Sequence, residues 1–270
     1  MKDDLERGKT LSEELQDDQS KTRQQPRASM DAPSIGDNIG AGHSAWSFFG
    51  LEGACFSEHI RKSVPFYDEG HDLVCRISDF FVTSTSPSIC YELGTSTANL
   101  LIKLAKHNQH KKNVRWVGID LAPELIAEGG KKTGELKNVE LVVDDIVTYE
   151  YEPTDFIVAC LTVQFVPPRI RQELINKIYN ALNWGGGFVL FEKVRAPDAR
   201  FQDMMTSLYN DFKLGKGYTS EEIINKAQSL RGILEPFSTE GNLGLLRRAG
   251  FEDIMTIMKY VCFECYLAIK

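Results

Sequence analysis

The sequence predicts an α/β fold organised around a mostly parallel, doubly wound sheet. Between residues 88 and 214, short apolar runs alternate with segments of helical periodicity. This alternation is typical of parallel strands joined by right-handed crossover helices. The chain then ends in two strand-like runs, 253–259 and 261–269, joined by a short turn that predicts an antiparallel hairpin. We therefore expect seven strands, of which the first five are parallel.

The individual elements follow from periodicity and from helix-ending residues. The clearest helix, 168–182, begins with Pro168 in its first turn and repeats apolar residues every four positions. The glycine triplet 185–187 is expected to end it, because glycine adopts the conformations found beyond a helix C-terminus. The remaining predicted strands are 89–93, 114–119, 139–143, 156–162 and 188–191, and the remaining predicted helices are 98–107, 123–132, 198–214, 220–234 and 239–249.

Three further regions complete the predicted organisation. Residues 1–45 contain no aromatic side chain and are rich in charged and amide residues, which predicts a disordered or weakly helical tail. Residues 46–86 are expected to form a helical lid interrupted near Pro65, since proline disfavours helix in the residue before it. Residues 198–249 form a helical insertion, so that one domain spans 46–270.

Composition narrows the class of protein. The formal net charge of −7 disfavours direct nucleic-acid binding through overall basicity. No run approaches the roughly 18 apolar residues of a membrane span, and no signal-peptide core precedes the domain, so a cytoplasmic location is expected. Six cysteines without framework spacing and five scattered histidines predict neither a disulfide scaffold nor a metal site.

The first predicted strand ends in a ligand-binding pattern. Glu92 closes the strand, Gly94 follows, and small hydroxylated residues lead into the helix that starts near Ala98. Glycine permits close backbone approach, and a helix N-terminus offers free N–H groups. The acidic residue suits a cationic or hydroxyl-bearing ligand better than a phosphate. Neither a G-x-G-x-x-G pattern nor a P-loop is present. The stretch resembles motif I of class I S-adenosylmethionine (SAM) methyltransferases.

Acidic residues also end the next two strands. Asp120 lies roughly thirty residues beyond motif I, where a carboxylate accepts both hydroxyls of a ribose; the alternative is a helix cap before Pro123. Asp145 is a candidate acceptor for the adenine amino group, with the Ile146 N–H on a ring nitrogen, and Asp144 competes for that role. Cys160, at the end of the fourth strand, is expected beside the methionine moiety.

Five motifs resemble the carboxy-S-adenosylmethionine (carboxy-SAM) synthase family, and the resemblance covers residues 46–270. They are Ser63-Val-Pro-Phe-Tyr67, Tyr91-Glu-Leu-Gly-Thr-Ser96, Leu161-Thr-Val-Gln-Phe165, Leu190-Phe-Glu-Lys193, and Asn210-Asp-Phe-Lys213 with Gly217-Tyr218. That family converts SAM and prephenate into carboxy-SAM for modification of the tRNA wobble uridine, and is usually oligomeric, which implies a homodimer. Motifs and resemblance together give the cofactor-binding set Tyr67, Glu92, Gly94, Thr95, Ser96, Asp120, Leu121, Asp145, Ile146 and Cys160.

One departure from the family governs the functional prediction. Ala227 aligns with the arginine that binds the added carboxylate in the family, and Arg231 lies four residues further on. Alanine offers no fork for a carboxylate. We therefore predict a methyltransferase that uses ordinary SAM on a small molecule, with C-methylation of an α-keto acid as the specific hypothesis and S-adenosylhomocysteine (SAH) as product. The alternatives are carboxy-SAM synthase activity and a SAM-binding protein without catalysis.

The acceptor side of the predicted pocket is defined by fewer signals. Lys193, Arg231 and Tyr218 are candidates for binding the substrate. His59, Tyr67, Tyr209 and Arg195 are candidates for catalysis, and the sequence does not single out one of them as a base. Neither the acceptor nor a metal requirement is specified by these residues.

Overall fold

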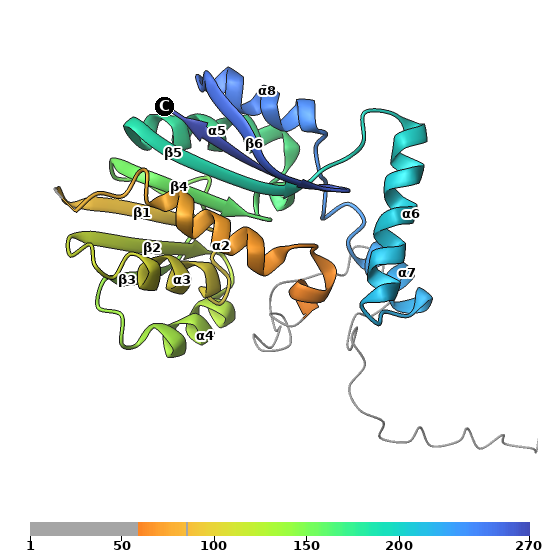
Figure 1. Ribbon diagram of the computed structural model, residues 1–270, viewed down its shortest axis with the longest axis horizontal. Coiled ribbons are helices and arrows are strands. Elements are labelled where there is room, and N and C mark those ends of the chain that lie inside the picture. Colours follow the sequence, from red (N-terminus) through yellow and green to blue (C-terminus); the bar gives the residue numbers. More distant parts are fainter. Residues whose placement is uncertain (1–58, 85) are drawn as a thin grey trace, which may run out of the picture. The chain divides into compact units, whose positions relative to one another are not determined.

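The structure, a computed structural model, describes residues 59–84 and 86–270 of the 270-residue chain. All of them belong to Ile35–Lys270, the second of two compact units. The predicted N-terminal tail and the first part of the predicted lid lie outside the described residues. Figure 1 shows the described elements in sequence colours.

A seven-stranded sheet organises this unit, in the order β3-β2-β1-β4-β5-β7-β6. Strands β1 to β5 pair in parallel, whereas β7 runs antiparallel to both β5 and β6. The predicted fold class is therefore confirmed, including the C-terminal hairpin. The strands are β1 Ser88–Leu93, β2 Val114–Asp120, β3 Val139–Val143, β4 Thr154–Cys160, β5 Leu182–Lys193, β6 Asp253–Tyr260 and β7 Phe263–Ile269.

Helices cover both faces of the sheet. α2 and α3 pack on one face, and α5 and α8 pack on the other, where α8 also lies against α5. α4 follows β2 and packs against β2 and β3. The helices are α2 Tyr67–Ser78, α3 Asn99–His107, α4 Pro123–Thr133, α5 Pro168–Ala181, α6 Ala199–Gly215, α7 Ser220–Ser229 and α8 Thr239–Ala249, with a 3-10 turn at Val163–Phe165.

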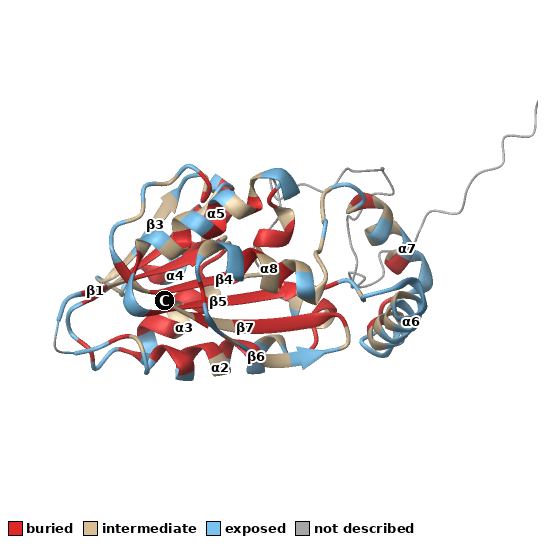
Figure 2. Cartoon of the chain, turned by 90° about the horizontal axis from the view of Figure 1, so that it is seen from above, coloured by how far each residue is buried: buried red, intermediate tan, exposed pale blue. Residues whose placement is uncertain are grey.

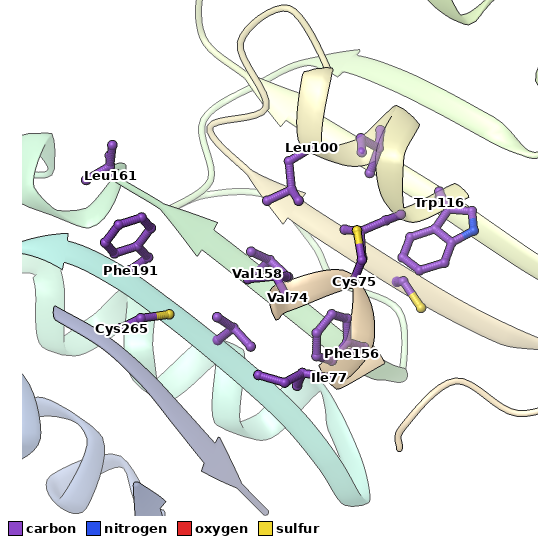
Figure 3. Close-up of a cluster of buried hydrophobic side chains, with 14 of the residues drawn as sticks. Val74, Cys75, Ile77, Leu100, Trp116, Phe156, Val158, Leu161, Phe191 and Cys265 are labelled. Atoms are coloured by element: carbon purple, nitrogen blue, oxygen red, sulfur yellow. The ribbon is translucent and has the colours of Figure 1, made fainter. Parts of the chain in front are cut away.

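Apolar side chains from α2 lock that helix onto the sheet. Figure 3 shows Val74, Cys75 and Ile77 beside Phe156 and Val158 of β4. Burying side chains of this size stabilises the fold by about 1.5–3 kcal/mol each. α2 is therefore part of the sheet's cover and not a free lid. Only its N-terminal end and the helical residues 59–63 before it approach the site described below.

Glycines account for two of the differences from the sequence-based expectation. Glycines 185–187 do not follow a helix C-terminus but lie within β5, with Gly185 at a φ of +79°. A β-carbon on Gly187 would stand 2.8 Å from the Phe81 ring, so this glycine serves close packing. α7 ends at Ser229 instead of 234, because Gly232 turns the chain away at a φ of +74°.

α6 and α7 stand beyond the carboxyl ends of the parallel strands (Figure 1). Figure 2 shows the contrast in burial: strands β1, β2, β4, β5 and β7 are mainly buried, whereas the edge strands β3 and β6 and helix α6 are mostly exposed or half-buried. Lys213 is the one residue of α6 that is buried. Lys213 lines the cavity that is described below.

Candidate functional site

A cavity of about 850 Å³ opens at the carboxyl edge of the sheet. The residues that follow β1, β2, β3 and β4 form one side of it, and residues of α6, α7 and the segment 59–67 also line it. Open α/β sheets bind ligands at this edge. The volume lies within the range of small-molecule sites. All ten predicted cofactor-binding residues line this cavity.

Glu92 organises the loop after β1. Its Oε2 accepts hydrogen bonds from Thr95 Oγ1 at 2.6 Å and from the Leu101 N–H at 2.9 Å. The side chain is 4% exposed, and burial raises the pKa of its carboxyl to about 8, although both hydrogen bonds favour the ionised form. Glu92 therefore shapes the loop as well as facing the cavity.

The same loop contains three left-handed residues in five positions. Gly94, Ser96 and Ala98 have φ values of +70°, +51° and +59°. A β-carbon on Gly94 would lie 2.4 Å from Thr162 Oγ1, so only glycine fits. The resulting turn leaves Ser96 Oγ buried at the cavity with no hydrogen-bond partner in the described residues. A buried hydroxyl of this kind fits a polar ligand group, as a SAM site requires.

Asp120 joins the ends of β1 and β2. Its Oδ2 accepts from the Ser96 N–H at 2.8 Å and its Oδ1 from the Ala122 N–H at 2.9 Å. α4 begins at Pro123 with Ala122 as its N-cap and no side-chain capping bond, so Asp120 is not that helix's cap. Because a carboxylate oxygen can accept two hydrogen bonds, Asp120 retains acceptor capacity for a diol. Burial raises the pKa of Asp120.

The end of β3 brings two carboxylates and one backbone amide to the cavity. Asp145 Oδ1 accepts from the Val147 N–H, and Asp144 Oδ1 accepts from the Asp145 N–H. Asp144 is exposed, Asp145 is half-buried and Ile146 is buried. Both aspartates line the cavity, so the geometry does not decide which of them accepts the adenine amino group.

Next to Cys160 lies a compact aromatic group from α2. His71 Nε2 lies 3.8 Å from Cys160 Sγ, and the His71 ring packs against Tyr67 with centroids 4.1 Å apart. Burial lowers the pKa of His71 to about 4 and raises the pKa of Tyr67, so both are neutral near pH 7. Sequence reasoning did not place His71 in the set.

Lysines form the opposite, basic end of the cavity. Lys193 Nζ and Lys213 Nζ lie 4.5 Å and 4.4 Å from the centroid of the Tyr209 ring. Lys226 Nζ donates to Ser63 Oγ at 2.8 Å. All three lysines line the cavity. Burial lowers the pKa of each of them, to about 8 for Lys213 and about 7 for Lys226.

Ser63 and Tyr218 hold this basic end together. The Ser63 carbonyl accepts from Tyr209 Oη at 2.8 Å, and Ser63 Oγ lies 2.7 Å from Tyr218 Oη. Tyr218 Oη also lies 3.1 Å from Nδ1 of His59, whose other ring nitrogen contacts Lys226. Tyr218 is 3% exposed and is not among the lining residues. It supports residues that do line the cavity, and its contact with a substrate stays a prediction.

Two predicted cations are exposed at the cavity. Arg195 pairs its backbone with residues 237 and 238, and Arg231 lies beyond the C-terminus of α7 instead of one helical turn along it. Both line the cavity with the catalytic candidates His59, Tyr67 and Tyr209. Sequence reasoning missed Lys213 and Lys226.

The signal that identifies those two lysines is helical spacing. Lys213 follows Tyr209 by four residues, and Lys226 follows Ile223 by three. Each lysine therefore shares a helix face with a residue that packs inward.

Two negative findings concern only residues 59–84 and 86–270. No group of three or more His, Cys, Asp or Glu side chains there is arranged to hold a metal ion. None of the helices in that part of the chain combines the length and the apolar character needed to span a membrane.

Comparison with known proteins shows the family. A methyltransferase domain model matches residues 91–186. A carboxy-S-adenosyl-L-methionine synthase from Staphylococcus epidermidis is 36% identical over 215 residues, which cover 80% of this chain and 92% of the relative. A synthase of the same name from Sulfurimonas denitrificans is 33% identical over 220 residues, covering 80% and 91%.

Solved structures support the fold. The SAM-dependent methyltransferase SibL in its apo form has a TM-score of 0.58 at 18% identity, and the match covers 82% of this chain and 59% of SibL. PigF with SAH has a TM-score of 0.56 at 17% identity, with 81% and 59% covered. At this identity the likeness concerns architecture: the chain has the class I SAM methyltransferase fold.

The functional prediction made from Ala227 is wrong. Relatives 31–36% identical over 80% of the chain are carboxy-SAM synthases, which contradicts C-methylation of an α-keto acid as the main reading. The missing guanidinium does not leave the cavity without cations, because three lysines line it and one of them precedes Ala227 directly. The protein is a SAM-dependent enzyme, and its chain belongs to the carboxy-S-adenosyl-L-methionine synthase family.

Proposed function

We propose that the protein synthesises carboxy-SAM from SAM and prephenate, which places it in modification of the tRNA wobble uridine. The observation that carries the proposal is the 36% identity to a synthase of that name across 92% of its length. The cavity supports it, because acidic strand ends and a basic helical end suit a cationic sulfonium compound and an anionic cosubstrate.

The reaction sets the requirements for the site. The methyl carbon of SAM loses a proton and gains a carboxyl group. Prephenate loses that carboxyl group and its ring hydroxyl, which leaves phenylpyruvate and, with the proton, water. The protein has to hold the two molecules in contact and exclude bulk water from the reacting carbon. Tyr67, His71 and Cys160 are near the position expected for the sulfonium, and all three are neutral near pH 7.

Site roles follow from this proposal. Asp120 accepts the ribose hydroxyls, and Asp145 with the Ile146 N–H binds the adenine edge. Glu92 and Ser96 face the methionine portion. All of these residues line one cavity, which supports the assignments. Asp120 also has remaining acceptor capacity, and the buried Ser96 hydroxyl has no hydrogen-bond partner in the described residues.

Mass spectrometry of reaction mixtures tests the proposal. Purified protein with SAM and prephenate is expected to give a SAM derivative heavier by one carboxyl group, together with phenylpyruvate. Mixtures lacking protein or prephenate are the controls. Transfer of labelled methyl from SAM to a keto acid, with no carboxylated product, would reject the proposal.

Oligomeric state and location belong to the same proposal. By resemblance to the family, we propose a homodimer that acts in the cytoplasm and does not bind nucleic acid directly. Light scattering on the full-length chain measures the first point, and a monomer at micromolar concentration would contradict it. Fractionation of the cells that produce the protein measures the second.

A further inference from the structure

The segment that follows β3 carries one backbone donor that the described residues leave unused. Five of the six N–H groups of residues 144–149 donate to acceptors in the described part of the chain, and the N–H of Ile146 is the exception. The acceptors are the Asp120 carbonyl for residue 144, Asp144 Oδ1 for 145, Asp145 Oδ1 for 147, and the Asp145 carbonyl for 148 and 149. Ile146 is 7% exposed and lines the cavity. Buried N–H groups are nearly always paired, so this donor suits an acceptor on a bound ligand.

Tyr151 holds the carbonyl of the same residue. Its Oη donates to the Ile146 carbonyl oxygen at 2.6 Å, and no other described residue donates to that oxygen. Burial raises the pKa of Tyr151, so the phenol stays protonated at neutral pH and keeps the proton that it donates. Tyr151 does not line the cavity, whereas Ile146 does. The phenol therefore acts on Ile146 from outside the cavity.

Contacts with the sheet and with α5 hold the rest of this segment. The Tyr151 ring packs edge-on against Tyr91 and Tyr149, with ring centroids 5.3 Å and 5.2 Å apart. Tyr91 lies in β1, is 1% exposed, and its Oη accepts from the N–H of the residue after Tyr151 at 3.2 Å. Lys177 of α5 donates to the carbonyls of residues 147 and 148. The phenol is therefore held by β1 while it holds Ile146.

We propose that Tyr151 is a positioning residue for the adenine ring, because its hydrogen bond to the Ile146 carbonyl holds the Ile146 N–H where it donates to a ring nitrogen of SAM. This inference rests on the adenine contact that the proposed function gives to Ile146. Hydrogen bonds weaken steeply once the donor angle falls below about 120°. Without the phenol, rotation of residue 146 would misalign the N–H and reduce the affinity for the adenine ring.

Calorimetry with SAH and its deaza analogues tests the inference by binding alone. In each analogue, one nitrogen of the purine ring is replaced by C–H. Wild-type protein should bind the analogue that lacks the acceptor for Ile146 about tenfold more weakly than SAH, the effect of one hydrogen bond. Tyr151→Phe removes only the hydroxyl and should bind SAH about 3- to 10-fold more weakly than wild type does. The same variant should bind that analogue as tightly as wild type does, because the contact is already absent.

Two other variants serve as controls. Tyr149→Phe is the matched one, since Tyr149 belongs to the same ring cluster, is half-buried like Tyr151, and its hydroxyl makes no hydrogen bond in the described part of the chain. It should bind SAH and every analogue as wild type does. Lys177→Met frees the next two carbonyls and leaves the Tyr151 bond to Ile146 in place. Any loss of affinity in Lys177→Met should be equal for SAH and for the analogues.

The outcomes separate this inference from the proposed function. An unchanged SAH affinity in Tyr151→Phe, or an equal loss for SAH and every analogue, would overturn the positioning role. Equal wild-type affinities for SAH and all analogues would overturn both that role and the adenine contact of Ile146. Formation of carboxy-SAM is measured separately by mass spectrometry. If the predicted pattern of affinities is found in a protein that makes no carboxy-SAM, the proposed function is rejected and the positioning role is retained.

Discussion

Substitution of Gly94 by alanine tests whether close packing against Thr162 shapes the cofactor loop. A non-glycine residue at φ +70° costs about 1–2 kcal/mol. The new β-carbon would also meet Thr162 Oγ1 at 2.4 Å and Cγ2 at 2.5 Å, so the threonine has to rotate. Rotation costs about 1 kcal/mol, and loss of its 2.8 Å hydrogen bond to the Leu93 carbonyl costs about 1 kcal/mol more. The free energy of unfolding should therefore fall by about 3–4 kcal/mol.

A double-mutant cycle separates backbone strain from the clash. Thr162→Ala alone is expected to cost about 1 kcal/mol through the lost hydrogen bond. In the Gly94→Ala/Thr162→Ala protein the nearest remaining atom is the residue-162 β-carbon at 3.0 Å, so the double variant should be about 1–2 kcal/mol more stable than additivity predicts. Urea unfolding followed by circular dichroism measures this, with SAH calorimetry on each variant. Strict additivity, or a loss below about 1 kcal/mol in Gly94→Ala, would refute the reasoning.

Three further predictions follow from the site. Asp120→Ala should weaken SAH binding about 10- to 100-fold by calorimetry, because a charged acceptor is lost. Glu124→Ala is the control, since Glu124 lies next to the site but does not line the cavity. Equal losses of SAH affinity in the two variants would contradict the role of Asp120 in binding the ribose. Glu192→Gln should lower the free energy of unfolding by about 2 kcal/mol. The Glu192 carboxylate accepts hydrogen bonds from the N–H groups of residues 162–164, and the single oxygen of an amide cannot accept all three. An unchanged urea midpoint would disprove this. Lys226→Met should be more stable than wild type below pH 7, and the difference in melting temperature should shrink as pH rises from about 7 toward 10. The sign follows because the folded-state pKa of Lys226 is depressed from 10.5 to about 7, so the unfolded chain binds more protons across that window. A difference independent of pH would argue against the burial of this charge.

Local patterns were sufficient to predict the sheet and one wall of the cavity. Glu92, Asp120 and Asp145 each follow an apolar run, and parallel strands bring their carboxyl ends to one edge. The parallel pairing follows from the alternation of strands and helices, and the C-terminal hairpin follows from its short turn, whereas the strand order was not predicted. This wall of the cavity could therefore be predicted because each of its acidic residues is marked by the apolar strand directly before it.

The basic wall could not be predicted in the same way. Its three lysines come from three different elements, and no local sequence pattern indicates that these elements lie side by side. They are Lys193 of β5, Lys213 of α6 and Lys226 of α7. The alignment at Ala227 shows the loss of one cation, whereas the presence of three lysines in one cavity depends on the tertiary fold, so the predicted function was wrong. The prediction for the glycines within β5 was also wrong, because the role of Gly187 depends on Phe81, which lies about a hundred residues away in sequence.

Ser63 has a consequence for the entropy of binding. Both of its oxygens are engaged, one by α6 through Tyr209 and the other by α7 through Lys226, and the segment that contains it continues into α2. Because α2 is fixed in the core, folding itself holds Lys193, Lys213 and Lys226 in place through Ser63 and Tyr209. A ligand that arrives later does not have to immobilise three long side chains one by one, and most of its interaction energy remains available as affinity.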